Sequence, residues 1–126
     1  MTTQTILITG ASSGFGRDTA LTLARAGYTI YASMRDPPGR NRDKAESLAS
    51  EATKEKLPLK IIELDVTSTD SVNRAVAGVV AEAGRIDVLV NNAGYATAGV
   101  SEGFTDAQVA RQFDVNVVGV QRMLRA

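Results

Sequence analysis

Apolar residues in this chain gather in short runs, which alternate with longer segments where apolar positions recur every three or four residues. In one such segment, Ala45, Leu48, Ala49 and Ala52 follow the spacing i, i+3, i+4, i+7 of a single helix face. The predicted strands are residues 5–9, 28–34, 59–65 and 86–91. The predicted helices are residues 15–26, 41–56, a third between Thr67 and Gly84, and a last one from Thr105 to the end of the chain.

Strands that alternate with helices predict βαβ units, and therefore an α/β fold with a parallel sheet and helices on both faces. Right-handed crossovers restrict the order of the strands, and we expect the Rossmann-like order 3-2-1-4 within a single domain over residues 1–126. Capping boxes are expected at two helix starts, Thr67-x-x-Asp70 and Thr105-x-x-Gln108.

The composition is that of an ordinary globular protein, and it excludes several kinds of chemistry. Of the 126 residues, 44% are apolar and 22% are charged, and 14 basic side chains balance 14 acidic ones, so we expect neither a nucleic acid nor a membrane as partner. The absence of cysteine and histidine excludes disulfides, Ser–His triads and thiolate or histidine metal sites, and we expect no metal. No apolar run approaches ~20 residues and the N-terminus leads straight into a strand, so we expect a cytoplasmic protein.

A glycine-rich turn, Thr9 to Arg17, lies between the first predicted strand and the first predicted helix. Glycines in such a turn permit close approach of the backbone to a pyrophosphate, and the helix N-terminus offers unpaired N–H groups and a positive dipole end. The spacing is Gly-x-x-x-Gly-x-Gly, and the two serines add hydroxyl donors. The cofactor-binding residues that we expect here are Gly10, Ser12, Ser13, Gly14, Phe15 and Gly16.

Three further strings occur in order along the chain. Asp65-Val66 ends the third predicted strand, Asn91-Asn92-Ala93-Gly94 ends the fourth, and Phe113-Asp114-Val115-Asn116 lies in the last helix. Together with the glycine-rich turn, this set strongly resembles the short-chain dehydrogenase/reductase family, and the resemblance covers the whole chain. It implies an NAD(P)-binding Rossmann fold and hydride transfer between a nicotinamide cofactor and a carbonyl or alcohol carbon.

The resemblance also implies roles for residues at the ends of the third and fourth strands. The Asp65 carboxylate accepts a hydrogen bond from the adenine amino group and the Val66 backbone contacts the ring; alternatively, Asp65 only caps the following turn. Asn91 braces the sheet, while Ala93 and Gly94 lie against the ribose. Asn92 belongs to the same Asn-Asn-Ala-Gly string and is expected to bind the cofactor. In the alternative interpretation, much of this string only supports the fold.

The end of the second strand indicates which cofactor is used. NAD-type sites place a carboxylate there, whereas NADP-type sites use arginine for the extra phosphate. Arg35 follows the strand directly, as in NADP-using members that the sequence resembles, and Ser12 is expected to donate from the opposite side. Arg17 is a further cation that either lies nearby or points away. Asp36 argues against this preference for NADP. Its carboxylate either binds the ribose of NAD or starts the Pro-Pro turn, so NAD is the alternative cofactor.

Asn116 lies on a stripe of otherwise apolar residues in the last predicted helix. Val109, Phe113, Val120 and Leu124 share that stripe, which we expect to face the sheet. By resemblance, Asn116 is the catalytic asparagine that holds a water linking an active-site lysine to solvent. The alternative is a core asparagine that only satisfies local backbone groups.

The family's acid/base tyrosine and its lysine form a Tyr-x-x-x-Lys motif beyond a fifth strand, and a serine orients the substrate. The sequence ends before such a strand, and its tyrosines Tyr28, Tyr31 and Tyr95 are not followed by lysine at the fourth position. We therefore expect the cofactor-binding half of an NADP(H)-dependent dehydrogenase/reductase that is inactive by itself.

The alternative function is a stand-alone nucleotide-binding half-Rossmann module without catalysis. A small-molecule substrate is expected only where the remaining half is present. A homo-oligomer is expected through the last helix or through the edge of the fourth strand, where Val88 and Val90 stand beside unpaired backbone groups.

Overall fold

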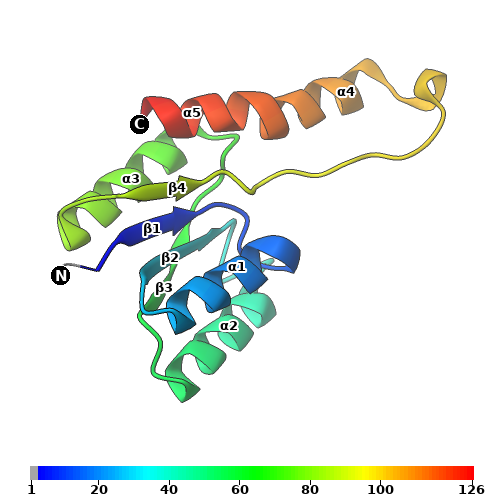
Figure 1. The fold of residues 1–126 in the computed structure, drawn as a ribbon. Helices are drawn as coiled ribbons and strands as arrows, with labels where there is room; N and C mark the ends of the chain where they lie inside the picture. The colour runs from blue at the N-terminus through cyan, green and yellow to red at the C-terminus, as the bar shows by residue number, and fades with distance from the viewer. Residues whose placement is uncertain (1–2) are drawn as a thin grey trace.

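A computed structural model of the chain describes residues 3–126. Four strands form one parallel sheet with the order β3-β2-β1-β4, which confirms the predicted topology (Figure 1). The strands are β1 (Thr5–Ile8), β2 (Thr29–Met34), β3 (Leu59–Glu63) and β4 (Val88–Val90). The register aligns Leu7 of β1 with Tyr31 of β2 and with Leu89 of β4, so the carboxyl ends of the strands share one edge.

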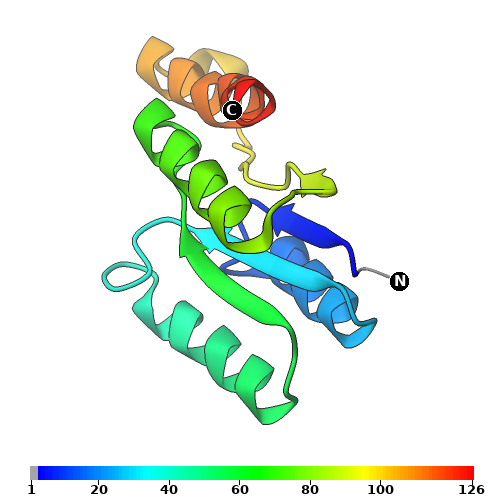
Figure 2. The ribbon, with the colours of Figure 1, turned by 90° about the vertical axis from the view of Figure 1, so that its left-hand side faces the viewer.

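Helices cover both faces of this sheet, as predicted. Helices α1 (Gly14–Arg25) and α2 (Arg42–Lys54) lie on one face, and α3 (Thr69–Ala83) lies on the other beside the last helical segment (Figure 2). That last segment comprises α4 (Asp106–Phe113), a π-helical turn η2 (Asp114–Val118) and α5 (Gly119–Arg125). A short 3-10 turn, η1 (Ser101–Gly103), precedes it.

Two apolar cores result, because successive side chains of a strand point to opposite faces of the sheet. Ile6 and Ile8 of β1 pack with Leu21 of α1 and Leu48 of α2. Leu7 points the other way and packs in the core that α3 and α5 cover. Strands buried on both faces explain why the sequence shows continuous apolar runs in place of an alternating pattern.

The two expected capping boxes have different outcomes. At α4 the box is present, because the Thr105 hydroxyl accepts from the Gln108 amide at 3.2 Å and the Gln108 side chain accepts from the Thr105 amide at 2.9 Å. The prediction of a capping box at Thr67 is wrong. The Thr67 hydroxyl donates to Asp65, so Ser68 becomes the N-cap of α3 and accepts from the Ser71 amide at 3.2 Å.

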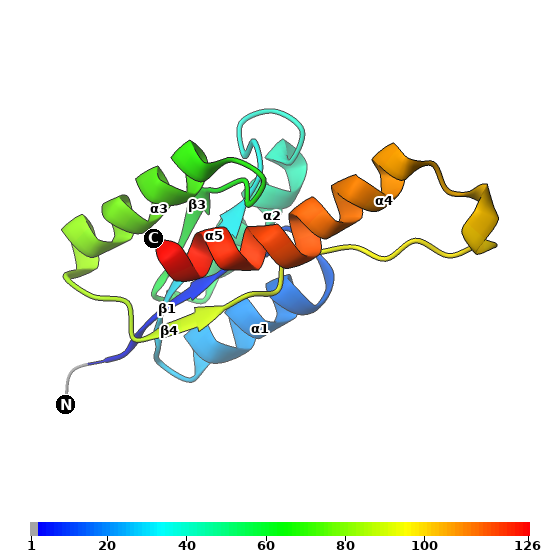
Figure 3. The same ribbon diagram turned by 90° about the horizontal axis from the view of Figure 1, so that it is seen from above.

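The last helix differs from the regular helix that the sequence predicts. The π-helical turn adds a residue to one turn and thereby shifts the phase of the helix. As a result the predicted sheet-facing stripe is wrong: Phe113 and Leu124 are 60% and 66% exposed, whereas Val115 and Met123 are buried. Seen from above, this segment crosses the sheet, and the loop between β4 and α4 reaches far from the sheet before α4 returns (Figure 3). In the part of the chain that the structure describes, no helix combines the length and apolarity needed to cross a membrane.

Candidate functional site

A cleft of about 700 Å³ lies at the carboxyl ends of the strands, on the edge where open parallel sheets bind ligands. Its volume falls in the range of ~300–1,000 Å³ that is typical of small-molecule and cofactor sites. The predicted residues that line it are Gly10, Ser12, Ser13, Phe15, Arg35, Asp65, Val66, Asn92, Ala93 and Gly94. Gly14, Gly16 and Asn116 lie outside the lining. The structure thus gathers residues from the ends of all four strands around one cavity.

A hydrogen-bonded floor joins β1 to β4 beneath this cleft. The hydroxyl of buried Thr9 accepts from the amides of Asn92 and Ala93 at 3.0 and 2.9 Å. The Asn92 side chain in turn donates to the carbonyls of Thr9 and Gly10 at 3.1 and 3.0 Å. Asn92 therefore performs the bracing that the sequence analysis gave to Asn91, which is exposed, and that assignment is corrected by one residue. Sequence reasoning also missed Thr9 as the anchor of the floor.

The glycine-rich turn fits tightly against this floor. Gly10 has φ +67°, and a Cβ there would stand 2.8 Å from the Ala93 Cα. A Cβ at Gly16 would overlap the Gly10 carbonyl oxygen, so α1 packs directly under the turn. The Ala11 amide donates to the Ser33 carbonyl at 2.8 Å, which anchors the turn to β2 as well.

The start of α1 has the features of an anion site. Ser13 is the N-cap, yet among the described residues its side chain makes no capping bond, and Ser13 is exposed at the cleft. A Cβ at Gly14 would meet open space, and the first turn, Gly14 to Arg17, carries no carboxylate. Unpaired first-turn amides and free hydroxyls are the donor set that a diphosphate requires, so these residues fit a dinucleotide.

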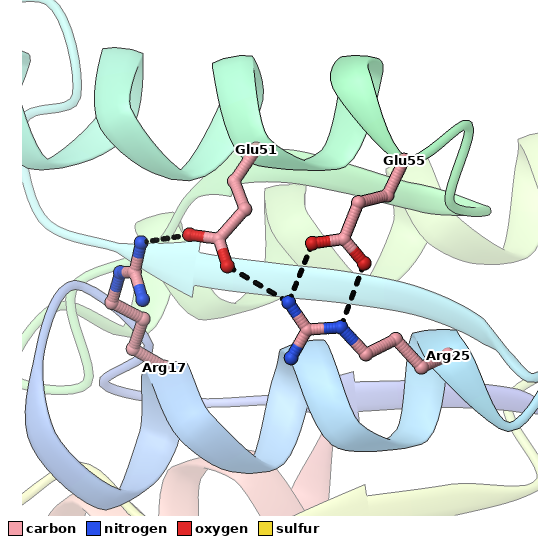
Figure 4. A network of polar contacts seen from close by, with 4 residues as sticks. All are labelled: Arg17, Arg25, Glu51 and Glu55. Atoms are coloured by element: carbon pink, nitrogen blue, oxygen red, sulfur yellow. Dashed lines mark hydrogen bonds and ion pairs between the residues drawn. The ribbon is translucent and has the colours of Figure 1, made fainter.

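The two residues that follow β2 differ in where their side chains go. Arg35 is exposed and lines the cleft. Asp36 has φ +43° and its carboxylate accepts from the Arg40 amide at 2.8 Å, so it builds the Pro-Pro turn, as one of the alternatives foresaw. Arg17 points away from the cleft, because its guanidinium pairs with Glu51 of α2 at 2.6 Å, next to the Arg25–Glu55 pair (Figure 4).

Asp65 combines both interpretations that the sequence left open. Its Oδ1 accepts from the Thr67 amide at 2.9 Å and from the Thr67 hydroxyl at 2.7 Å, so Asp65 caps the turn after β3 while it also lines the cleft. Partial burial opposes ionisation, but the Thr67 bonds and the charges of Arg35 and Arg111 outweigh it and hold the pKa of Asp65 below its ordinary value. The carboxylate at this edge is therefore ionised at neutral pH.

Asn116 lies behind the cleft, within the π-helical turn. Its Oδ1 accepts from the Tyr95 amide at 3.0 Å and its Nδ2 donates to the Tyr95 carbonyl at 2.7 Å. Gly94 lies against this pair, since a Cβ there would stand 3.0 Å from the Asn116 oxygen. Asn116 thus holds the loop after β4 through local backbone groups, and its catalytic role stays a prediction.

Several polar residues of the cleft were not expected from the sequence. Arg40, Asn41 and Lys44 line it from the start of α2, and Arg111 lines it from α4. One signal could have indicated the first three: a crossover helix after β2 begins at the carboxyl edge of the sheet, so polar and charged side chains there lie near the ligand. Within residues 3–126, no three His, Cys, Asp or Glu side chains gather as a metal site.

The sheet order, the glycine-rich turn and the cleft define a Rossmann-type dinucleotide-binding protein. Residues 4–126 match the short chain dehydrogenase family, and the chain belongs to it. It is 38% identical, over its whole length, to the 3-ketodihydrosphingosine reductase of Bacteroides thetaiotaomicron, and 40% identical to human 17-beta-hydroxysteroid dehydrogenase type 1. It spans 41% and 38% of these relatives.

A solved structure agrees with this assignment. The alcohol dehydrogenase of the archaeon Thermococcus sibiricus, complexed with 5-hydroxy-NADP, superposes with a TM-score of 0.86 and 30% identity. The superposition covers 98% of this chain and 51% of the archaeal chain. The chain thus has the Rossmann-like fold of the family and spans about two fifths to one half of these relatives' length.

Proposed function

We propose that this chain binds NADP(H) in the cleft and supplies the cofactor-binding half of an oxidoreductase that moves a hydride between nicotinamide and a carbonyl or alcohol carbon. One observation carries the proposal. The start of α1, which has no side-chain cap, lines the same cavity of cofactor size as Arg35 and Asp65. The complex of the Thermococcus sibiricus relative with an NADP derivative supports the choice of cofactor.

Each part of the dinucleotide has a matching group in the cleft. The first-turn amides of α1, with Ser12 and Ser13, suit the diphosphate. The ionised Asp65 suits the adenine amino group, because an acceptor-only carboxylate pairs with an N–H donor. Ala93 and Gly94, fixed by the Thr9 and Asn116 bonds, suit the ribose beside the nicotinamide.

Arg35 gives the preference for NADP(H) over NAD(H) in this proposal. A guanidinium forms forked, charge-assisted bonds with a phosphate monoester. The carboxylate that would serve a NAD ribose, Asp36, is already engaged by the Arg40 amide in the turn after β2. The two side chains together favour the phosphorylated cofactor.

The chain's own contribution to the reaction is binding and orientation. A bound nicotinamide cofactor supplies the hydride, while Asn116 holds the Tyr95 backbone at the edge of the site. The 126 residues contain no Tyr-x-x-x-Lys motif, so the proton donor of the proposed reaction comes from a further segment or chain. The alternative proposal, a nucleotide-binding module without catalysis, rests on the same observation.

The expected association of copies also stays a proposal. Val109, Phe113, Val117 and Leu124 expose apolar surface on the last helical segment, and Val88 is 37% exposed on β4. Sedimentation of the purified chain at several concentrations tests it, and a monomer throughout would contradict it.

Titration of the 126-residue chain with NADPH and with NADH tests the proposed function. Wild type should prefer NADPH, and Arg35→Ala should weaken NADPH binding by ~10–100-fold with little change for NADH, because a charge-assisted bond to phosphate is lost. Arg74→Ala, a change of an exposed arginine of α3, should alter neither affinity. Equal affinities of wild type for both cofactors would contradict the NADP preference, and failure to bind either would contradict cofactor binding itself.

Turnover separates the two functional proposals. A chain that binds NADPH but oxidises it with no member of a panel of ketones and aldehydes would be a binding half or a module. Turnover that appears only when a segment carrying Tyr-x-x-x-Lys is supplied would support the oxidoreductase and would overturn the module.

A further inference from the structure

The segment between β2 and α2, residues 35–41, is folded around Asp36. The Asp36 carbonyl accepts from the amides of Gly39 and Asn41 at 3.2 and 3.1 Å, and its carboxylate accepts from the Arg40 amide. A Cβ at Gly39 would collide with that carboxylate, so the turn closes tightly on itself. Arg35, just before the turn, and Arg40, at its end, are thereby held on the same rim of the cleft.

Asn41 is the unusual member of this segment. It is the N-cap of α2, a position where asparagine normally accepts from an amide of the first helical turn. Among the described residues its side chain makes no such bond. It is 8% exposed, and its Nδ2 donates backwards to the Arg35 carbonyl. The Asn41 side chain thus does not cap α2. It is buried and bonded to the Arg35 carbonyl, so it is placed to fix the backbone of Arg35.

Within residues 3–126, the side chains of Arg35, Arg40 and Lys44 form no ion pair. Arg35 directly follows β2, Arg40 lies at the end of the turn and Lys44 lies in the first turn of α2, and all three line the cleft. The ion pairs formed among residues 3–126 involve other side chains, such as Arg42 with Glu46 on the outer side of the same helix. A dianionic group in this part of the cleft would meet positive charge from all three side chains.

We propose that Asn41 is a positioning residue that holds Arg35 on the part of the cleft that Arg40 and Lys44 also line, so that the three cations together bind the ribose phosphate that distinguishes NADP(H) from NAD(H). The inference rests on the proposed function and deepens it. It attributes the selectivity for NADP(H) over NAD(H) to the turn after β2 and to the start of α2 as well as to Arg35.

A double-mutant cycle with Asn41→Ser and Arg35→Ala tests this role. Serine retains the ability to cap α2 but is too short to reach the Arg35 carbonyl. Asn41→Ser should weaken NADPH binding by about tenfold and leave NADH binding unchanged. In the Arg35→Ala background the same change should have no further effect on NADPH binding.

The outcomes separate this inference from the proposed function. Equal losses for NADPH and NADH, or a loss that persists without Arg35, would show that Asn41 only supports the fold. A selective wild type with an unaffected Asn41→Ser variant would overturn the inference alone, whereas an unselective wild type would overturn both.

Two single changes keep the test informative if Asn41→Ser does not fold. Arg40→Ala and Lys44→Ala should each weaken NADPH binding several-fold without changing NADH binding, because each removes a charge from this part of the cleft. Arg42→Ala is the matched control, since Arg42 lies in the same turn of α2 but pairs with Glu46. If Arg40→Ala and Lys44→Ala behaved like Arg42→Ala, the inference would be wrong.

Discussion

The part of the chain from β1 to β3 and the part from β4 onward form opposite walls of the cleft, and they are held in different ways. In the first, β1 and nearly all of β2 are fully buried, and helices α1 and α2 pack on them. In the second, β4 is only three residues long, residues 94–103 are exposed, and Phe113 and Leu124 point largely to solvent.

The second wall buries fewer apolar side chains, chiefly Val115 and Met123, and a few polar contacts hold it as well. Thr9 with Asn92 joins β4 to β1, Asn116 holds the Tyr95 backbone, and Arg122 donates to the Val66 carbonyl. A small number of hydrogen bonds stabilises less than a buried apolar face does, since each contributes only about 1 kcal/mol net. The comparison indicates a rigid first wall and a more easily displaced second wall, which in the proposed function lie beside the adenosine and the nicotinamide, respectively.

Truncating the core of the first wall should have the largest effect on stability. Leu48 of α2 is fully buried, so Leu48→Ala should lower the free energy of unfolding by about 2–5 kcal/mol. Leu124→Ala, in the second wall, removes a side chain that is 66% exposed and should cost less than about 0.5 kcal/mol. Urea denaturation measures both, and similar costs would mean that the last segment is buried in solution.

Breaking the contact between the two walls should have the second-largest effect on stability. Gly10→Ala combines a left-handed backbone with overlap onto the Ala93 Cα, so we expect a loss of about 2–4 kcal/mol and of cofactor binding. Gly84→Ala is the control: Gly84 has φ +77° at the end of α3 but open space around it, and should cost about 1 kcal/mol. Equal losses in thermal denaturation would show that strain alone matters at Gly10.

Removing the arginine that ties the second wall to the end of β3 should have a smaller effect. Arg122 donates to the Val66 carbonyl at 2.9 Å and to the Asp114 carboxylate at 2.7 Å, across the π-helical turn. Arg122→Met should cost about 2 kcal/mol, and hydrogen exchange should quicken in residues 114–118. The exposed Arg125, changed to Met, should cost less than about 0.5 kcal/mol. Unchanged exchange in Arg122→Met would show that packing alone holds the turn.

The first wall was largely predictable from the sequence, because the patterns of apolar residues and glycines in the sequence directly indicate its elements. Buried strands appear as apolar runs, α2 as the spacing of Ala45 and Leu48, and the turn as glycines between a strand and a helix. The strand order then follows from the rules of βαβ connection. The cleft follows too, since parallel strands end at one edge.

The second wall was less predictable from the sequence, because its details depend on contacts between particular side chains that lie far apart along the chain. The Arg122 bonds to Val66 and Asp114 accompany the π-helical turn, and the run Val115-Asn116-Val117-Val118 does not reveal them. The shift of the bracing residue from Asn91 to Asn92 depends on where the Thr9 hydroxyl meets β4. The positions of Arg40 and Lys44 at the cleft were missed for a related reason, since they depend on the turn that Asp36 closes.

The smallest expected effect concerns the pKa of Asp65, which responds to both walls. Thr67 and Arg35 lower this pKa from the first wall, and Arg111 of α4 lowers it from the second. Since the folded-state pKa lies below the unfolded value of about 3.9, ionised Asp65 stabilises the fold above that pH. This contribution is lost as the pH falls through the folded-state pKa. The unfolding free energy of Asp65→Asn should therefore depend less on pH below about 4 than that of wild type.

An NMR titration of the Asp65 carboxyl group in Arg111→Met then tests where the second wall lies in solution. If α4 stays over the cleft, removing the Arg111 charge should raise the pKa of Asp65 toward its ordinary value. Removing the Arg125 charge, at the far end of the last segment, should leave the pKa unchanged. Because the Arg111 contribution is Coulombic and falls with distance, an unchanged pKa in Arg111→Met would mean that α4 spends most of its time away from the cleft.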